Sequence, residues 1–296
     1  MKPSNKIAVV GLGSMGYGIA VSLLRAGHTV VGLDVSETVV ENFHAAGGAT
    51  DDGAVFDAAV VVVLNAAQTE DVLFGADGIV SRLQPGGVVV SCATVPPQFA
   101  VEMEARCAAQ NVLYLDAPIS GGSVKAGLGQ LSIMASGRSE AFAAAKPVLD
   151  ATAQTVFELG AKAGPGSAMK AVNQLLAGVH IATMAEALTF GMTQGVTPEK
   201  FLEVISKCAG TSWMLENRAP HIVEGNYTPH SSVNIWPKDL GIVLDVAQAA
   251  GFEAPIATAA LAQFDAAKHM GLGTEDDAAV AKVYAKQAGL TLKGEA

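Results

Sequence analysis

The stretch from Lys6 to Asp34 limits the fold of this chain more than any other. An apolar run, Lys6–Val10, enters the sequence GLGSMG at 11–16, which has the pattern G-x-G-x-x-G. A helical spacing of apolar residues follows, and a second apolar run, Thr29–Leu33, ends at Asp34. A strand, a glycine-rich turn, a helix and another strand in this order form a unit with parallel strands. The N-terminal part is therefore expected to be an α/β domain.

The same stretch predicts a dinucleotide site. Glycines let the backbone approach a pyrophosphate, and the N–H groups and dipole at a helix start favour negative charge. Asp34 follows at about the 20-residue spacing of the acid that binds the ribose hydroxyls, and Val35–Val40 holds no Arg or Lys for a 2′-phosphate. An ordinary glycine-rich turn is the alternative, but the whole context favours NAD. The expected contacts are Gly11, Leu12, Gly13, Ser14, Met15, Gly16 and Asp34.

Strand and helix patterns continue to alternate as far as Gly160. The apolar runs Ala59–Leu64, Gly87–Ser91 and Val112–Asp116 are typical of buried strands. Two more strand candidates, Leu131–Ala135 and Val156–Leu159, flank an alanine-rich helix. This alternation predicts a doubly wound sheet of the Rossmann type, in which ligands gather at the carboxyl ends of the strands.

Beyond Gly160 only helical patterns are found. Gly164–Gly195 contains no proline after Pro165 and is rich in Ala, Leu and Met, so it predicts one helix on the order of 40 Å long. Its apolar residues lie on nearly all sides, as in a buried helix. We therefore expect a Rossmann domain at 1–162 and an all-α domain at 163–296, joined by this long helix.

Lys170 is the first candidate for chemistry. It shares a face of the predicted helix with Asn173 and His180, because residues three or four apart lie side by side. A lysine on a mostly buried helix is costly unless it is paired or used. Its amine either extends into solvent at the helix start or faces a cleft and transfers protons. The residues alone leave both possibilities open.

Polar groups gather at two further places. The loop Asp116–Ser123, DAPISGGS, can expose backbone N–H groups and hydroxyls to an anion, or it is an ordinary turn. Asn173 can bind a substrate or satisfy helix packing. Lys238 stands in the sequence WPKD, where proline and Asp are also ordinary residues of a helix start.

Charge and cysteine usage limit the partners. The formal net charge is −10 and no basic run occurs, so we expect no nucleic acid partner. The N-terminus has no signal-peptide layout, and the densest apolar run, Ala58–Leu64, is too short to span a membrane, so we expect no membrane association. Cys92, Cys107 and Cys208 are scattered, which predicts reduced core cysteines in a cytoplasmic protein. No cluster of ligands predicts a metal.

The chain resembles the β-hydroxyacid dehydrogenase family, the relatives of 3-hydroxyisobutyrate dehydrogenase, over essentially its whole length. Four motifs in the same order carry the resemblance: GLGSMG at 11–16, DAPISGG at 116–122, GPGSAMKAVNQ at 164–174 and KDL at 238–240. The resemblance implies a homodimer or homotetramer whose helical domain serves substrate binding and oligomerisation. It implies that Lys170 is the general acid/base, with Asn173 beside it. It further implies that Ser120, Gly121 and Gly122 hold the substrate carboxylate, and that Leu64, Asn65, Thr94 and Lys238 contact the cofactor.

Within the family, four stretches are most similar to L-threonate dehydrogenases, and tartronate semialdehyde reductases share part of this likeness. The stretches are 123–137, 173–188, 212–218 and 273–280. The resemblance implies NAD-linked oxidation of a small hydroxy acid, with L-threonate oxidised at C2 to a 2-oxo acid as the first choice. A 3-hydroxyisobutyrate dehydrogenase, a semialdehyde reductase and a non-catalytic binding relative are the alternatives, and the presence of Lys170 disfavours the last.

Overall fold

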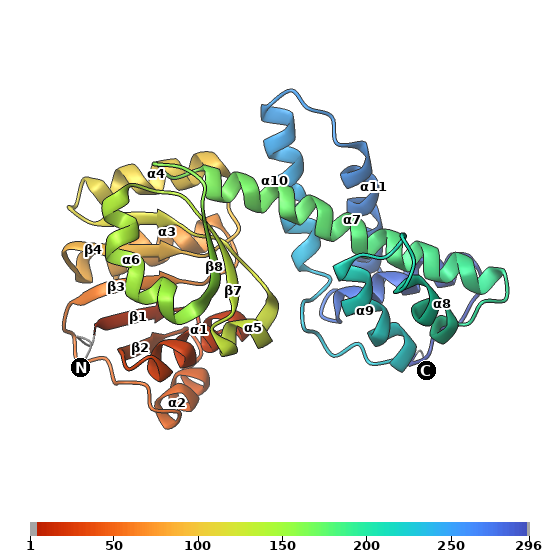
Figure 1. Cartoon of the computed structure of the whole chain (residues 1–296), viewed down its shortest axis with the longest axis horizontal. Coiled ribbons are helices and arrows are strands. Elements are labelled where there is room, and N and C mark those ends of the chain that lie inside the picture. Colours follow the sequence, from red (N-terminus) through yellow and green to blue (C-terminus); the bar gives the residue numbers. More distant parts are fainter. Residues whose placement is uncertain (1–4, 295–296) are drawn as a thin grey trace. The chain divides into compact units, whose positions relative to one another are not determined.

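The computed structural model describes residues 5–294 and contains two compact units (Figure 1). The first ends at Lys170 and the second begins at Ala171. The division falls inside the long helix rather than before it. The predicted order, a parallel α/β sheet followed by an all-helical part, is confirmed. Residues 1–4, on which the prediction of a missing leader partly depends, lie outside the described part of the chain.

The first unit is built on a five-stranded parallel sheet with the order β2-β1-β3-β4-β5. The strands are β1 (Lys6–Val10), β2 (Thr29–Leu33), β3 (Phe56–Val61), β4 (Leu83–Ser91) and β5 (Leu113–Asp116). Alternate residues of β1 enter two different cores: Ile7 and Val9 pack on one face, and Ala8 packs on the other. A sheet covered on both faces needs continuous apolar strands, which is the pattern found in the sequence.

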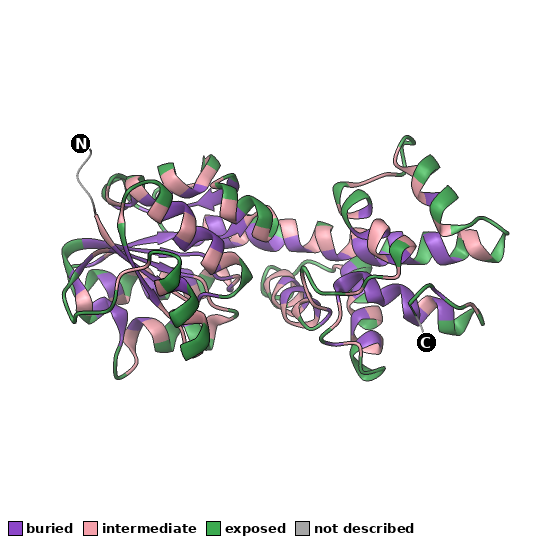
Figure 2. Ribbon diagram, turned by 90° about the horizontal axis from the view of Figure 1, so that it is seen from below, coloured by how far each residue is buried: buried purple, intermediate pink, exposed green. Residues whose placement is uncertain are grey.

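The helices of this unit cover the sheet. They are α1 (Ser14–Arg25), α2 (Glu37–Ala45), α3 (Ala66–Phe74), η1 (Ile79–Arg82), α4 (Pro97–Ala108), α5 (Gly122–Leu128) and α6 (Ser139–Thr152). Figure 2 shows the strands buried and the outer turns of the helices exposed. No helix was predicted from the sequence at α3 or α5. The reason is clear for α5, which begins at Gly121 and Gly122, two residues with positive φ that local helix propensity disfavours.

Two predicted strands do not join the parallel sheet. Leu131–Ala135 (β7) and Ala153–Glu158 (β8) form a second, three-stranded sheet with the short β6 (Ile119–Ser120). β6 pairs antiparallel to β7, and β8 pairs parallel to it. Most residues of β8 are exposed, so the strand lacks the apolar content of a central parallel strand. A backbone bridge between Asp116 and Ser136 links the ends of β5 and β7.

The long helix α7 spans Pro165–Thr193 and runs unbroken from the first unit into the second (Figure 1). Its length and composition would allow it to cross a membrane, and it is the one helix within residues 5–294 of which this is true. The densest apolar run in the sequence, Ala58–Leu64, lies outside this helix, so its length was not predicted as a possible membrane span. Ile181, Ala185 and Leu188 of α7 lie in the hydrophobic core of the second unit, as core helices of globular proteins do.

The second unit is helical and surrounds that core. Its helices besides α7 are α8 (Pro198–Ile205), α9 (Trp213–Glu224), α10 (Ile235–Ala249), α11 (Pro255–His269), η2 (Asp277–Val280) and α12 (Ala281–Gln287). The segment 277–287 is thus a 3₁₀ turn followed by α12, and α10 begins three residues before Lys238. No helix was predicted from the sequence at α9, whose interior contains Pro220, a residue that local helix propensity disfavours.

Candidate functional site

The carboxyl ends of the five parallel strands lie along one edge of the sheet in the first unit. Gly11, Asp34 and Thr94 follow β1, β2 and β4, and Asp116 ends β5. Asn65 follows β3 after a short segment and begins α3. The topology therefore brings these predicted positions to one edge, which is where ligands bind in such sheets.

The three glycines of the first loop have different tasks. Gly11 has φ +91°, and a Cβ at Gly16 would lie 1.8 Å from the carbonyl oxygen of Gly11, so the fold itself requires both. Gly13 has φ −62°, which any residue adopts, and no atom lies within 4 Å of the place of its Cβ. The fold does not need a glycine there. Open space over the start of α1 is what a bound pyrophosphate requires, so the loop fits the dinucleotide.

Asp34 is held by the loop that it serves. Its Oδ2 accepts a hydrogen bond from the backbone N–H of Leu12 at 2.7 Å, and its Oδ1 accepts one from Ser36 at 2.9 Å. A carboxylate has about four acceptor sites, so two remain for ribose hydroxyls. A cavity of about 420 Å³ adjoins Asp34, and Glu37, Glu41 and Asp51 also line it. This concentration of acids disfavours a 2′-phosphate and fits an unphosphorylated ribose.

The other predicted cofactor contacts of the first unit are less distinctive. Asn65 caps α3 by accepting the backbone N–H of Gln68 at 2.9 Å. Gln68 in turn accepts the N–H of Leu64 at 2.9 Å, and the Leu64 side chain is exposed. Thr94 is half-buried after β4. The structure gives Asn65 a capping task of its own, and cofactor contact by these three residues stays a prediction.

Lys170 is buried, with 9% of its surface exposed, so its amine does not simply extend into solvent. Its Nζ donates a hydrogen bond to the carbonyl oxygen of Ile119 at 2.9 Å. Ile119 directly precedes Ser120, Gly121 and Gly122 in the chain. The structure therefore brings the predicted acid/base to the predicted carboxylate-binding loop.

Asp116 begins the candidate loop, but no role was predicted for its side chain. Its Oδ2 accepts the backbone N–H groups of Gly164 and Ser167, each at 2.9 Å, and its Oδ1 accepts the Ser167 hydroxyl at 2.7 Å. Burial raises the pKa of this carboxyl, while the hydrogen bonds from Ser167 and Gly164 oppose the shift. The start of α7, one turn before Lys170, is thus fastened to the end of β5.

Ser136 completes this attachment. Its hydroxyl donates to Asp116 Oδ2 at 3.2 Å and accepts the N–H of Gly166 at 2.9 Å. A Cβ at Gly166 would lie 2.5 Å from the carbonyl oxygen of Met134, so only glycine fits there. Pro165 has no N–H, and the N–H of Ala168 bonds to Gly164. Every N–H group at this helix start therefore has a partner within the protein.

The remaining two site candidates lie in the second unit. Asn173 Nδ2 donates to Gln174 Oε1 at 2.9 Å, and Gln174 Nε2 donates to Asp239 Oδ2. Lys238 Nζ forms an ion pair with Asp239 Oδ1 at 2.6 Å. A chain of side chains thus connects Asn173 with Lys238. Gln174 and Asp239, which connect them, were not predicted as functional.

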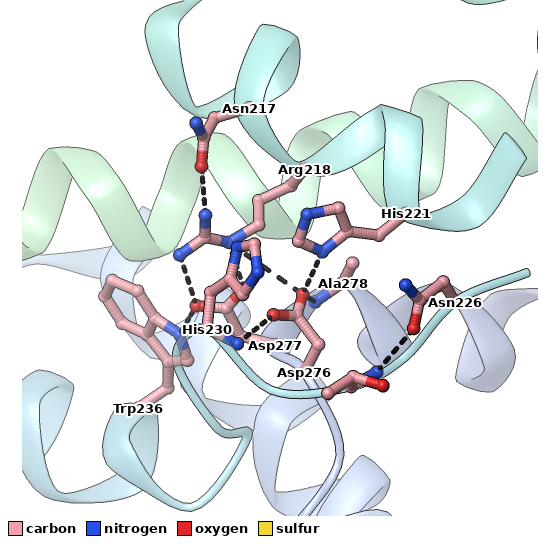
Figure 3. Close-up of polar contacts among 10 residues, drawn as sticks. Asn217, Arg218, His221, Asn226, His230, Trp236, Asp276, Asp277 and Ala278 are labelled. Atoms are coloured by element: carbon pink, nitrogen blue, oxygen red, sulfur yellow. Dashed lines mark hydrogen bonds and ion pairs between the residues drawn. The ribbon is translucent and has the colours of Figure 1, made fainter. Parts of the chain in front are cut away.

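A larger polar cluster lies behind the start of α10 (Figure 3). Asp277 accepts hydrogen bonds from Arg218 and from Trp236 Nε1, the latter at 2.9 Å. Burial alone would raise the pKa of the neighbouring Asp276, but hydrogen bonds from His221 and from backbone N–H groups outweigh it and lower that pKa. Since Trp236 stands two residues before Lys238, the cluster supports the helix turn that carries this lysine. We assign it a structural task.

The cysteines differ from one another. Cys92 and Cys107 are buried, as predicted, and burial raises the pKa of each to about 12. Cys208 is exposed, so its assignment to the core was wrong. Cys208 lies in the polar segment that follows α8. The prediction for it rested on residue type alone, because cysteines are usually buried, and did not use this polar context. Among the described residues, no group of three or more His, Cys, Asp or Glu is placed to bind a metal.

Two family models together match most of the chain. The NAD-binding domain of 6-phosphogluconate dehydrogenase matches residues 6–160. The model described as NAD-binding of NADP-dependent 3-hydroxyisobutyrate dehydrogenase matches residues 164–284. The two matches meet at the start of α7.

Full-length relatives agree with these models. The chain is 48% identical to an L-threonate dehydrogenase of Cupriavidus necator over 99% of both chains. It is 44% identical to an L-threonate dehydrogenase of Escherichia coli, over 97% of this chain and 96% of the relative. The crystal structure of a 3-hydroxyisobutyrate dehydrogenase from Salmonella typhimurium, 44% identical, superposes with a TM-score of 0.90 over 95% of this chain and 100% of the other. With the dinucleotide loop and the buried Lys170, these matches show that the chain belongs to the NAD-dependent β-hydroxyacid dehydrogenase family, the oxidoreductases related to 3-hydroxyisobutyrate dehydrogenase.

Proposed function

We propose that this enzyme oxidises L-threonate at C2 to the 2-oxo acid, with NAD as the hydride acceptor. The observation that carries the substrate is the identity of 43–48% to several L-threonate dehydrogenases over nearly their whole length. A 2-(hydroxymethyl)glutarate dehydrogenase of Eubacterium barkeri is 33% identical.

Lys170 is the residue that we assign to proton transfer. Its neutral amine takes the proton of the C2 hydroxyl as the C2 hydrogen leaves with its electron pair, and the ammonium form returns a proton in the reverse direction. NAD, when bound, accepts that hydride. The hydrogen bond to Ile119 and the fastened start of α7 hold the amine in one place, so little reorganisation is needed.

The substrate carboxylate is assigned to the loop beside Lys170. Gly121 has φ +137° and Gly122 has φ +77°, backbone conformations that favour glycine, so no side chain of these two residues covers the N–H groups of this loop. The half-buried hydroxyl of Ser120 precedes them. In a protein with net charge −10, such a local concentration of donors is needed to bind an anion.

The second unit is assigned to substrate binding and to assembly. Asn173 and Lys238 belong to it, and large apolar side chains are exposed on it. They include Phe190, Val196, Trp213, Phe252 and Ile256. Together with the resemblance to the family, these exposed side chains are the basis on which we assign a homodimer or homotetramer. A mass near 30 kDa by light scattering at micromolar concentration would contradict the oligomer. We further place the enzyme in the cytoplasm.

A substrate panel tests the proposal. The purified enzyme is mixed with NAD and with L-threonate, D-threonate, glycerate, tartronate or 3-hydroxyisobutyrate, and the absorbance of the reduced cofactor is followed. We expect the highest kcat/KM with L-threonate. Because the chain is similar to the Salmonella 3-hydroxyisobutyrate dehydrogenase, 3-hydroxyisobutyrate is the main alternative substrate. If it were oxidised far better than L-threonate, the substrate assignment would be wrong while the family and the chemistry would stand.

A further inference from the structure

The amide groups of Asn173 and Gln174 have only one arrangement that satisfies their neighbours. The carboxylate of Asp239 can only accept hydrogen bonds when it is ionised. Gln174 must therefore present its NH₂ group to Asp239, which leaves its Oε1 directed at Asn173. Asn173 must then present its own NH₂ group to Gln174. The Asn173 carbonyl is consequently fixed on the side away from Gln174.

Burial makes this arrangement costly to change. Gln174 is 8% exposed and Asp239 is 3% exposed, so water cannot replace a lost partner easily. The second carboxylate oxygen of Asp239 lies 2.6 Å from Lys238 Nζ, so both oxygens of this carboxylate face donors. Asn173 is half-buried, and 29% of the Lys238 side chain is exposed. These two residues, at the ends of the row of linked side chains, therefore reach the surface of the unit.

We propose that Gln174 and Asp239 are positioning residues, which fix the orientation of the Asn173 amide and hold the Lys238 ammonium group. Neither residue contacts substrate in this proposal. They act through the two end residues, so that Asn173 Oδ1 always faces outward as an acceptor for a hydroxyl. This inference rests on the proposed function, because it assumes that Asn173 serves the reaction.

The first test measures coupling between Gln174 and Asn173. Gln174→Met keeps the length of the side chain but removes both polar groups. We expect kcat with L-threonate to fall about tenfold or more in the otherwise unchanged enzyme, since misplacement by about 1 Å can cost about 10²-fold. In the Asn173→Ala background the same change should cost less than about twofold, because the group to be positioned is gone. Equal losses in both backgrounds would overturn the proposal.

A matched control separates positioning from general stability. Lys282 is buried to a similar extent in the same unit and pairs with Glu275 at 2.6 Å. Lys282→Met should lower the Tm as Gln174→Met does, but leave kcat and the Kd of NAD unchanged. If Asn173→Ala alone left kcat unchanged, the assignment of Asn173 in the proposed function would itself be wrong. If Asn173→Ala lowered kcat and Gln174→Met did not, only the present inference would fail.

The second test reverses the direction of the hydrogen bonds and needs no activity. Asn173→Asp places a carboxylate at each side of Gln174, which can donate to only one of them, so the Tm should fall. Asn173→Asp combined with Asp239→Asn lets Gln174 donate to residue 173 and accept from residue 239. We expect the double variant to recover most of the lost Tm without recovering kcat. If the double variant were no more stable than Asn173→Asp, the proposed direction of the hydrogen bonds among residues 173, 174 and 239 would be wrong. This test does not depend on whether Gln174→Met folds.

Discussion

The helices α1 and α7 both begin at a glycine-rich segment, yet their first turns have opposite fates. At α1 the capping residue is Gly13, no side chain caps the helix, and the first turn contains no acid. At α7 the carboxylate of Asp116 and the hydroxyl of Ser136 accept the N–H groups at the helix start. Helix starts attract anions, and here one helix leaves its site open while the other is closed by an anion of the chain.

The difference follows from what each helix start must do. The open start of α1 can receive the pyrophosphate of NAD, which is present only when the cofactor binds. The closed start of α7 is permanently fixed to the end of β5, and Lys170 lies one turn further along. We therefore expect changes at α1 to affect binding and changes at α7 to affect turnover. The predictions below test this division.

The largest effect is expected from Lys170→Ala. Removing a positioned acid/base lowers kcat by about 10²–10⁴-fold, while the affinity for NAD should remain, because the dinucleotide loop is untouched. Lys170→Arg should restore little, since a guanidinium does not release its proton near neutral pH. Thermal unfolding, NAD affinity and kcat are measured on the same samples, with the exposed Lys162→Ala as control. A folded Lys170→Ala enzyme with near-normal kcat would refute the mechanism.

Asp116→Ala should be the next most severe change, and it strikes the closed helix start. Several buried donors lose their acceptor, which costs about 2–4 kcal/mol of unfolding free energy. Because Lys170 is held by the same turn, kcat should fall about tenfold in the protein that remains folded, with NAD affinity preserved. Asp116→Asn retains an acceptor and should be milder on both measures. A loss of NAD affinity that exceeded the loss of kcat would contradict the division between the two helices.

Gly13→Val tests the open start in the opposite way. The position has φ −62° and no atom within 4 Å, so the Tm should change little. The added side chain occupies the space that a pyrophosphate needs, and the Kd of NAD should rise at least about tenfold, or about 1.4 kcal/mol. Gly16→Ala is the contrasting variant, since its Cβ would strike the Gly11 carbonyl and should destabilise the fold. If Gly13→Val bound NAD as tightly as the original enzyme, the assignment of the pyrophosphate site to the start of α1 would be wrong.

The sequence predicted the open site better than the closed one. The G-x-G-x-x-G spacing and Asp34 are local signals, and the parallel strands place the other candidates at one edge. Asp116 meets Ser167 across 51 residues, and Gln174 meets Asp239 across 65. Such long-range partners leave no periodic pattern. An Asp at the end of a buried strand, without a cation nearby in sequence, was the only available signal for Asp116.

The preference of the enzyme for NAD over NADP is expected to be similar to, or smaller than, the effect of Gly13→Val on the Kd of NAD. Asp34 and the acids around the adjoining cavity should repel a 2′-phosphate, giving at least about a tenfold preference for NAD over NADP in kcat/KM, or about 1.4 kcal/mol. Asp34→Arg should shift the preference toward NADP. It should not change the pH dependence of turnover, because we assign proton transfer to Lys170 on α7. Equal efficiency of the original enzyme with both cofactors would contradict the assignment.

The smallest effect concerns thiol labelling, which reports whether the start of α7 stays closed. Cys92 follows β4, and burial, with the nearby charge of Asp116, raises its pKa to about 12. At pH 8 only about 10⁻⁴ of such a thiol is ionised, and the thiolate is the reactive form. Iodoacetamide should therefore modify exposed Cys208 in the native enzyme, and Cys92 and Cys107 only after unfolding. Burial is the main cause of the raised pKa of Cys92 and the Asp116 charge is the smaller one. Asp116→Ala removes that charge and loosens the helix start, so Cys92 should be labelled faster in the folded variant than in the original enzyme, while the labelling of Cys107, on α4, should not change. Peptide mass spectrometry of the labelled protein distinguishes the three sites, and rapid labelling of Cys92 in the original native enzyme would show that this region is open after all.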